Sequence, residues 1–211
     1  MNKNRTQRKI NRFRRVYDKT INSGRERLNY PFAKFVALMP YMTEETIKGI
    51  VFIPVPKTFC KKPVPQDLQG VTFGTLTQLQ QAPTDNDYLK TCCKLVSVLM
   101  GVPADVVASR RAVDVLGVVN MIQAEMERIG KLFKSLQVEK SSDELMAGIE
   151  QLDFGAFGLV DWYAQRMGII DHEEVFKTPW ARIFQCMKID YERGEFEKRY
   201  RKLVTRRTSK K

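Results

Sequence analysis

The sequence predicts a mainly α-helical protein: a helical domain of six to seven helices follows an extended, proline-rich N-terminal arm, itself preceded by a basic amphipathic helix. Apolar residues recur at helical spacing from residue 68 to about residue 205. Six of the nine prolines fall between residues 31 and 65, where they disfavour long helices and central strands. Lys and Arg gather at both ends of the chain. We therefore expect four segments, which are residues 1–30, 31–67, 68–205 and 206–211.

Residues 1–30 are expected to form the basic amphipathic helix. Four apolar residues follow one another at steps of three, four and four, which places them on one helical face. They are Ile10, Phe13, Tyr17 and Ile21. Lys and Arg fill most of the other faces. We expect the apolar face to pack on protein in preference to stacking on nucleic-acid bases.

Residues 31–67 are expected to form short extended pieces and loops. Proline removes a backbone donor and fixes φ, so a run of prolines confines strands to sheet edges. Residues 49–55 fit one such edge strand. Two arrangements remain open for the segment, an arm that crosses another surface and a small compact sheet.

Helical spacing then continues through residues 68–205, and short connections favour neighbouring helices that pack as one domain. The expected helices cover residues 75–81, 84–99, 103–109, 111–136, 143–152, 155–167 and 179–202. Ser141 with Glu144 matches a capping box at the start of one helix. Gly101 and Gly168 follow the ends of two others and suit left-handed caps. Residues 206–211 form a short basic tail.

The segment DHEEVFKTPW, which begins at Asp171, contains the single histidine of the chain beside three carboxylates. A zinc helix of the two-histidine kind requires a second histidine four residues after the first, and that position is Phe176. Asp171 with Glu174 instead resembles a capping box. Thr178 before Pro179 suits a second helix start. We therefore expect two helix starts here and not a catalytic or metal site.

Composition places the chain among globular proteins, because 211 residues with 43% hydrophobic content bury a sizeable core. No apolar run approaches the roughly 18 residues of a membrane span, and no secretory leader pattern is recognised. The four cysteines are too few for a disulfide scaffold, so we expect free, mostly buried thiols and a reducing compartment.

Motifs of catalysis are hard to find. The chain has neither a P-loop nor a dinucleotide-binding glycine pattern, and it lacks the nucleophile elbow of serine hydrolases. The segment GAFG, residues 155–158, matches the loop of a KH domain in spacing only, and close helix packing explains it better. We therefore expect a protein that is not an enzyme and has no cofactor and no bound metal.

Charge is distributed unevenly along the chain. Residues 1–30 carry a net +8 and residues 188–211 a net +6 of the total +12, which leaves −2 between them. Two basic ends on a nearly neutral body are typical of arms that meet an anionic partner, although a solubilising fringe remains an alternative. The expected contact residues, for a protein or nucleic-acid partner, are Arg8, Lys9, Arg12, Arg14, Arg15, Arg199, Arg201 and Lys202.

Two stretches resemble proteins of tailed bacteriophages. Residues 70–122, which begin GVTFGTLTQLQQAPTDNDYLKTCC, resemble tail-assembly chaperones in their order of short and long helices. Residues 154–203, which include FGAFGLVDWYAQRMGIIDHEEVFKTPW, are similar to C-terminal parts of small phage morphogenesis proteins. The resemblance implies a structural virion protein of the head-to-tail connector, assembled in the host cytoplasm as a portal or tail ring.

The implied partners are copies of the chain in a ring, portal and tail subunits, and packaged DNA at the basic ends. The basic N-terminal segment and the proline-rich residues 31–67 depart from what a transient chaperone needs. A tail-assembly chaperone nevertheless remains one alternative function. A nucleic-acid-binding protein without sequence specificity is the other, since Lys and Arg attract phosphates whatever the base sequence.

Overall fold

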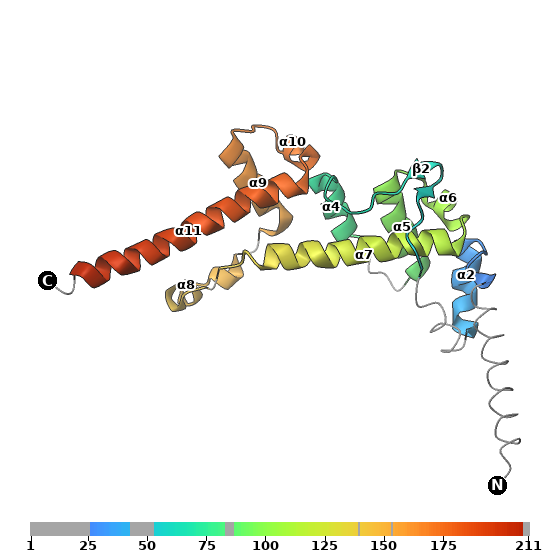
Figure 1. Cartoon of the computed structure of the whole chain (residues 1–211), viewed down its shortest axis with the longest axis horizontal. Helices are drawn as coiled ribbons and strands as arrows, with labels where there is room; N and C mark the ends of the chain where they lie inside the picture. The colour runs from blue at the N-terminus through green and yellow to red at the C-terminus, as the bar shows by residue number, and fades with distance from the viewer. Residues whose placement is uncertain (1–25, 43–52, 83–86, 139, 153, 209–211) are drawn as a thin grey trace, which may run out of the picture. The chain divides into compact units, whose positions relative to one another are not determined.

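The computed structural model describes residues 26–42, 53–82, 87–138, 140–152 and 154–208 (Figure 1). Within these ranges the protein is mainly helical, as predicted, with nine α-helices and one two-stranded sheet. The predicted N-terminal helix over residues 1–30 lies almost entirely outside the described residues. The chain forms two compact units, which are described separately below.

The first unit comprises Met1–Gln66 and Gln81–Ala124. Its core contains Phe32, Phe59 and Val107, each almost completely buried. Its elements are α2 (Phe32–Leu38), the 3-10 helix η1 (Met39–Tyr41), β1 (Thr58–Phe59), β2 (Lys62–Pro63), α5 (Tyr88–Met100), α6 (Ala104–Ala108) and the first part of α7 (Ala112–Lys134).

The proline-rich segment is less extended than predicted. Pro31 stands immediately before α2 and Pro40 follows it, so the prolines flank a helix and leave its interior hydrogen bonds intact. Phe32 and Phe35 of α2 are buried, which ties this segment into the core of the first unit. The predicted edge strand over residues 49–55 lies mostly outside the described residues, and residues 53–55 form no strand.

The hairpin of β1 and β2 supports the end of α5. Its two-residue turn, Cys60 and Lys61, has positive φ at both positions, as tight hairpin turns require. The following Lys62 points its Nζ atom at the end of α5 and donates to the carbonyls of Met100, at 2.9 Å, and Gly101, at 3.0 Å. Gly101 has left-handed backbone geometry and ends α5, as predicted.

Helix α7 begins in the first unit, where residues 54–56 approach it closely at Gly117. A Cβ atom at Gly117 would lie 2.4 Å from the carbonyl oxygen of Pro54 and 2.9 Å from Cδ of Pro56. The absence of a side chain therefore lets residues 54–56 lie directly on the helix. Prolines that the sequence assigned to an arm thus pack on the helical core of this unit.

The second unit comprises Asp67–Gln80 and Glu125–Lys211. Its elements are α4 (Phe73–Gln80), the end of α7, α8 (Ser142–Met146), the 3-10 helix η2 (Ile149–Gln151), α9 (Gly155–Met167), α10 (His172–Lys177) and α11 (Trp180–Thr208). Residues 68–205 therefore contribute to both units, and the predicted division into domains stays a prediction.

Trp180, at the start of α11, organises the core of the second unit. Its side chain is 2% exposed and its Nε1 atom donates to the carbonyl of Leu68 at 2.6 Å. Its ring packs with Phe133 of α7 and Phe184 of α11. Isolated bridge pairing of Thr72 with Pro179 fixes the same junction.

A carboxylate holds the segment that precedes α4. Glu125 accepts from the backbone N–H of Leu68 at 3.0 Å and from two nitrogens of Arg128 at 2.8 Å. The Arg128 guanidinium, followed by the Leu68 amide, outweighs the effect of burial and lowers the pKa of Glu125 below its ordinary value.

The predicted helix over residues 143–152 is shorter in the structure. Ser141 and Glu144 form the expected capping box, with hydrogen bonds of 2.7 and 3.2 Å between side chain and backbone. Gly148 then adopts positive φ and separates α8 from η2. The prediction of one continuous helix was wrong because a left-handed glycine interrupts the α-helical hydrogen bonds.

The segment around His172 contains one of the two predicted caps. Asp171 precedes α10 and accepts from the backbone N–H of Glu173 at 2.9 Å. Thr178 is not at the cap position of α11, because that helix begins at Trp180, two residues later. Its hydroxyl donates to the carbonyl of Glu174 at 3.1 Å. The Thr178 carbonyl accepts from the Phe73 amide at 2.8 Å, so this turn is used to join α4 and α10.

Candidate interaction surface on the last helix

Helix α11 changes character along its length. Trp180, Ile183 and Phe184 in its first turns are buried in the second unit. Every residue from 196 to 207 is exposed. In Figure 1 this last part of α11 extends beyond α9 and α10, the helices that pack around its beginning. A helix that continues for three turns without burial presents all its faces to a partner or to solvent.

One face of the exposed part carries large apolar side chains. Phe196, Tyr200 and Leu203 are 60, 59 and 56% exposed, and Ile189 lies on the same face seven residues before Phe196. The rings of Phe196 and Tyr200 stack with centroids 6.2 Å apart. We call Ile189, Phe196, Tyr200 and Leu203 the apolar stripe. Contiguous exposed apolar side chains mark interaction sites in soluble proteins.

A row of charged residues runs beside the apolar stripe. Its members follow one another at steps of three, four, three and four, so they share one helical face. We call them the charged row, and they are Glu192, Glu195, Arg199, Lys202 and Arg206. The two acids come first and the three bases last, which agrees with the preference of a helix C-terminus for cations.

The predicted contact residues divide into two groups. Arg199, Arg201 and Lys202 lie on the exposed part of α11, where Arg201 pairs with Glu197 at 3.4 Å. Within the described part of the chain no ion pair is found for Arg199 or Lys202. The other predicted contacts lie outside the described residues, and they are Arg8, Lys9, Arg12, Arg14 and Arg15.

The charge of α11 reverses at its middle. Residues 188–197 contain four acids and two bases, whereas residues 198–207 contain six bases and no acid. Lys198 pairs with Glu195 at 2.9 Å, and this hydrogen bond lowers the pKa of the Glu195 carboxyl. Exposed pairs of this kind support a helix weakly and leave most of the positive charge available to a partner.

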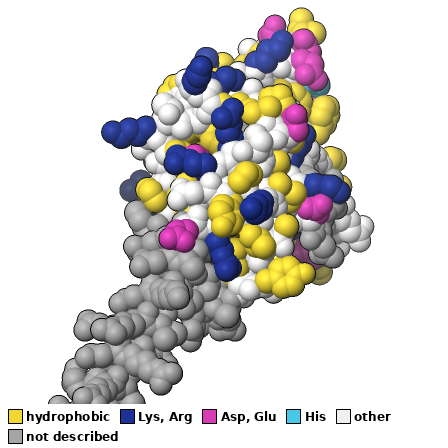
Figure 2. All heavy atoms as spheres, turned by 90° about the vertical axis from the view of Figure 1, so that its right-hand side faces the viewer, with side chains coloured by type: hydrophobic (Ala, Val, Ile, Leu, Met, Phe, Trp, Pro, Cys, Tyr) yellow, Lys and Arg dark blue, Asp and Glu magenta, His cyan; other side chains and the backbone are white. Residues whose placement is uncertain are grey.

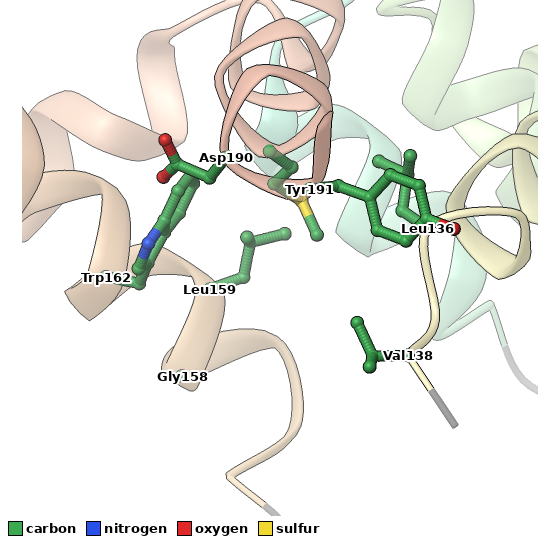
Figure 3. Close-up of a pocket in the computed structure, with 8 residues that line it drawn as sticks. Leu136, Val138, Gly158, Leu159, Trp162, Asp190 and Tyr191 are labelled. Atoms are coloured by element: carbon green, nitrogen blue, oxygen red, sulfur yellow. The ribbon is translucent and has the colours of Figure 1, made fainter. Parts of the chain in front are cut away.

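A groove lies beside α11 at Met187–Tyr191, before the exposed part of the helix (Figure 3). It has a volume of about 470 Å³, and Trp162 and Leu159 of α9 face Tyr191 of α11 across it. The remaining lining residues are Leu136, Val138, Gly158, Met187 and Asp190. Most of this lining is apolar, so the groove extends the apolar character of the surface toward α9.

Polar contacts at one edge of the groove hold α9 against α11. Arg166 of α9 forms an ion pair with Asp190 of α11, and its guanidinium lies over the Trp162 ring, 5.7 Å from the centroid. The Asp190 carboxylate raises the pKa of Arg166. At Gly158 a Cβ atom would lie 2.7 Å from that of Phe154. This contact lies within the start of α9, and a Cβ atom at Gly155 would meet nothing within 4 Å, so the predicted helix packing through the GAFG segment stays a prediction.

His172 is the first residue of α10, and its side chain contacts α9. Its Nε2 atom is 3.5 Å from Oδ1 of Asp161, and its ring meets Phe157 edge-on at 5.2 Å. Asp161 also accepts from the side-chain amide of Gln165 at 2.7 Å. Across the described ranges, no three His, Cys, Asp or Glu side chains lie close enough to hold a metal ion.

The cysteines are all free, as predicted. Cys92 and Cys93 are buried in α5, while Cys60 and Cys186 are half-buried. Burial raises the pKa of Cys93 to about 11. Its thiol is therefore protonated at neutral pH and a poor nucleophile.

Figure 2 shows a face of the molecule on which Lys and Arg side chains are scattered between apolar and uncharged ones and do not gather in one patch. Among the described helices none is long and apolar enough to cross a membrane. The end of α11, by contrast, exposes cations and apolar side chains together on one element.

Comparison with known proteins adds no family. No protein-family model, curated protein or solved structure matches this chain.

The sequence indicated the basic residues of this surface and the aromatic residues between them. It did not indicate the apolar stripe as a unit, although the spacing of Ile189, Phe196, Tyr200 and Leu203 carries that signal. The predicted helix ended near Lys202, and the structure continues it to Thr208. The groove beside Trp162 was not predicted, because it depends on how α9 packs on α11.

Proposed function

We propose that this protein is a non-enzymatic structural component of a tailed-phage particle, a subunit of the head-to-tail connector. It binds copies of itself and neighbouring virion proteins through exposed surfaces. The observation that carries the proposal is the end of α11, where apolar and basic side chains are exposed together. A binding surface on a helical scaffold is what an assembly protein requires.

The phage assignment rests on the resemblance of residues 70–122 and 154–203 to tail-assembly and morphogenesis proteins. Gly74, within the resembling segment, lies against α10, where a Cβ atom would come 3.1 Å from the Phe176 carbonyl. The same two segments therefore pack together in the second unit, at α4 and α10.

The test is mass spectrometry of purified particles from cells that produce the protein, with its copy number measured against the major capsid protein. A connector subunit gives a fixed, low copy number that fits a ring. Absence from particles, with abundant protein in the lysate, contradicts the proposal and favours the tail-assembly chaperone.

Binding of duplex DNA is the second measurement, because residues 198–207 carry six bases without an acid. A protein whose main role is to bind nucleic acid has an affinity that falls steeply between about 50 and 200 mM salt. A connector subunit that contacts mainly protein keeps its particle association over this range of salt.

A further inference from the structure

We propose that the exposed part of α11 pairs with the same helix of a second copy in antiparallel orientation. This inference deepens the proposed function and rests on its claim that α11 is an interaction surface. It commits the apolar stripe to one occupant, a second copy of this chain. The contact is two-fold symmetric, so it closes on itself and is separate from any contact that closes a ring.

The apolar stripe provides the centre of the contact. Phe196 and Tyr200 lie one turn apart near its middle, with Ile189 before them and Leu203 after them. In an antiparallel pair, Phe196 of one copy comes opposite Tyr200 of the other, and the same contact recurs across the two-fold axis. Aromatic side chains at the centre of an interface supply much of its binding energy.

The charged row fixes the orientation. With Phe196 opposite Tyr200, Glu192 of one copy lies within about one turn of Arg206 of the other along the helix axis, and both stand beside the stripe on the same side. This contact occurs twice because of the two-fold symmetry. In a parallel pair the two copies of the charged row lie on opposite edges of the contact, so its acids and bases do not meet. Charges beside an apolar stripe select helix partners and their direction in this way.

Within the charged row, Arg199 makes the like-charge contact, because its two copies lie near the axis. Each is flanked by a Glu195 carboxylate on its own helix, four residues away, and by the Glu195 of the second copy. The Arg199 guanidinium already contributes to the lowered pKa of Glu195. The central pair of cations is therefore enclosed by a matching pair of carboxylates.

The experiment is sedimentation equilibrium of the full chain over a wide range of protein concentration. Wild-type protein is expected to form a dimer. Leu203→Gln should raise the dissociation constant at least about tenfold, because it removes apolar burial twice per dimer. Thr205→Gln is the matched control, since it places the same side chain two residues away on the opposite face, and it should leave dimerisation unchanged. Circular dichroism checks that both variants keep their helical content.

Charge exchange tests the orientation. Glu192→Lys and Arg206→Glu should each weaken the dimer about two- to tenfold, and the double variant should recover most of the loss. Recovery requires acid and base on different copies to lie side by side, which a parallel pair does not provide. If the double variant loses as much dimer affinity as the two single variants lose together, the antiparallel pairing is overturned.

A wild-type chain that stays monomeric overturns the inference, whether or not it binds duplex DNA through this helix. These outcomes are independent of the proposed function. A monomer found in particles at fixed copy number contradicts only the self-pairing. A dimer disrupted by Leu203→Gln but absent from particles contradicts only the connector role.

Discussion

The two long helices, α7 and α11, differ in how they use their length. Helix α7 has 23 residues and buries side chains from Ala112 to Ile129. Helix α11 has 29 residues, yet its deeply buried side chains lie between Trp180 and Phe184. Packing therefore explains the length of α7 but not that of α11. The first turns of α11 therefore serve the fold, and the exposure of its last turns agrees with our proposal that they bind a partner.

The largest expected change in stability comes from a substitution at the beginning of α11, which we compare with one in its exposed part. Trp180→Ala removes a buried ring and leaves the Leu68 carbonyl without its donor, so the free energy of unfolding of the second unit should fall by about 3–5 kcal/mol. Phe196→Ala, in the exposed part of the same helix, should change stability by no more than about 0.5 kcal/mol. Chemical denaturation followed by tryptophan fluorescence and circular dichroism measures both. Equal losses would contradict the division of α11 into a folding part and a binding part.

A smaller change in stability is expected at Gly117 of α7, and Gly130 of the same helix provides the comparison. Gly117→Ala places Cβ against the Pro54 carbonyl, and we expect about 1–3 kcal/mol of destabilisation because backbone must move. Gly130→Ala meets nothing within 4 Å and should be neutral or stabilising by up to about 1 kcal/mol. Thermal unfolding of the two variants and the wild type provides the measurement. A harmless Gly117→Ala would show that residues 54–56 do not press on the helix.

The smallest effect concerns the pH dependence of Glu125. Its pKa is lowered in the folded protein, so its stabilising contribution is present above the ordinary value near 4.5 and is lost as the pH falls through the lowered value. Glu125→Gln should cost about 1–2 kcal/mol at pH 7, because the Arg128 and Leu68 donors lose a charged acceptor.

Denaturation at several pH values checks this prediction. The difference in free energy of unfolding between wild type and Glu125→Gln should shrink as the pH is lowered below about 4.5. A difference that stays constant down to pH 3 would show that the charge of Glu125 is not what holds the Leu68 amide.

Much of the fold follows from local patterns in the sequence. The long helix over residues 111–136 was expected, and the structure has it at Ala112–Lys134 because its apolar residues keep helical spacing throughout. The capping box of Ser141 was also found from spacing alone. Such features depend on neighbours within four residues, which a sequence displays directly.

Other features depend on contacts between distant segments. Proline content indicated an extended arm, but burial of Phe32 and Phe35 shows that residues near Pro31 belong to a core. Thr178 was expected to cap α11, and its hydroxyl turns back to Glu174 because the turn also joins α4. Of the binding surface, the cations were predicted and the apolar stripe was not, since exposure of Phe196 and Leu203 is a property of the folded chain.

Hydrogen exchange along α11, measured at low and high protein concentration, tests the central claim most directly. The account predicts that amides of residues 183–187 are protected at both concentrations by the core of the second unit. Amides of residues 196–207 should exchange quickly in dilute protein and become protected when the concentration is raised, as pairing of α11 stabilises the helix. If the protection of residues 196–207 is the same at both concentrations, the claim that this part of α11 pairs with a second copy is contradicted.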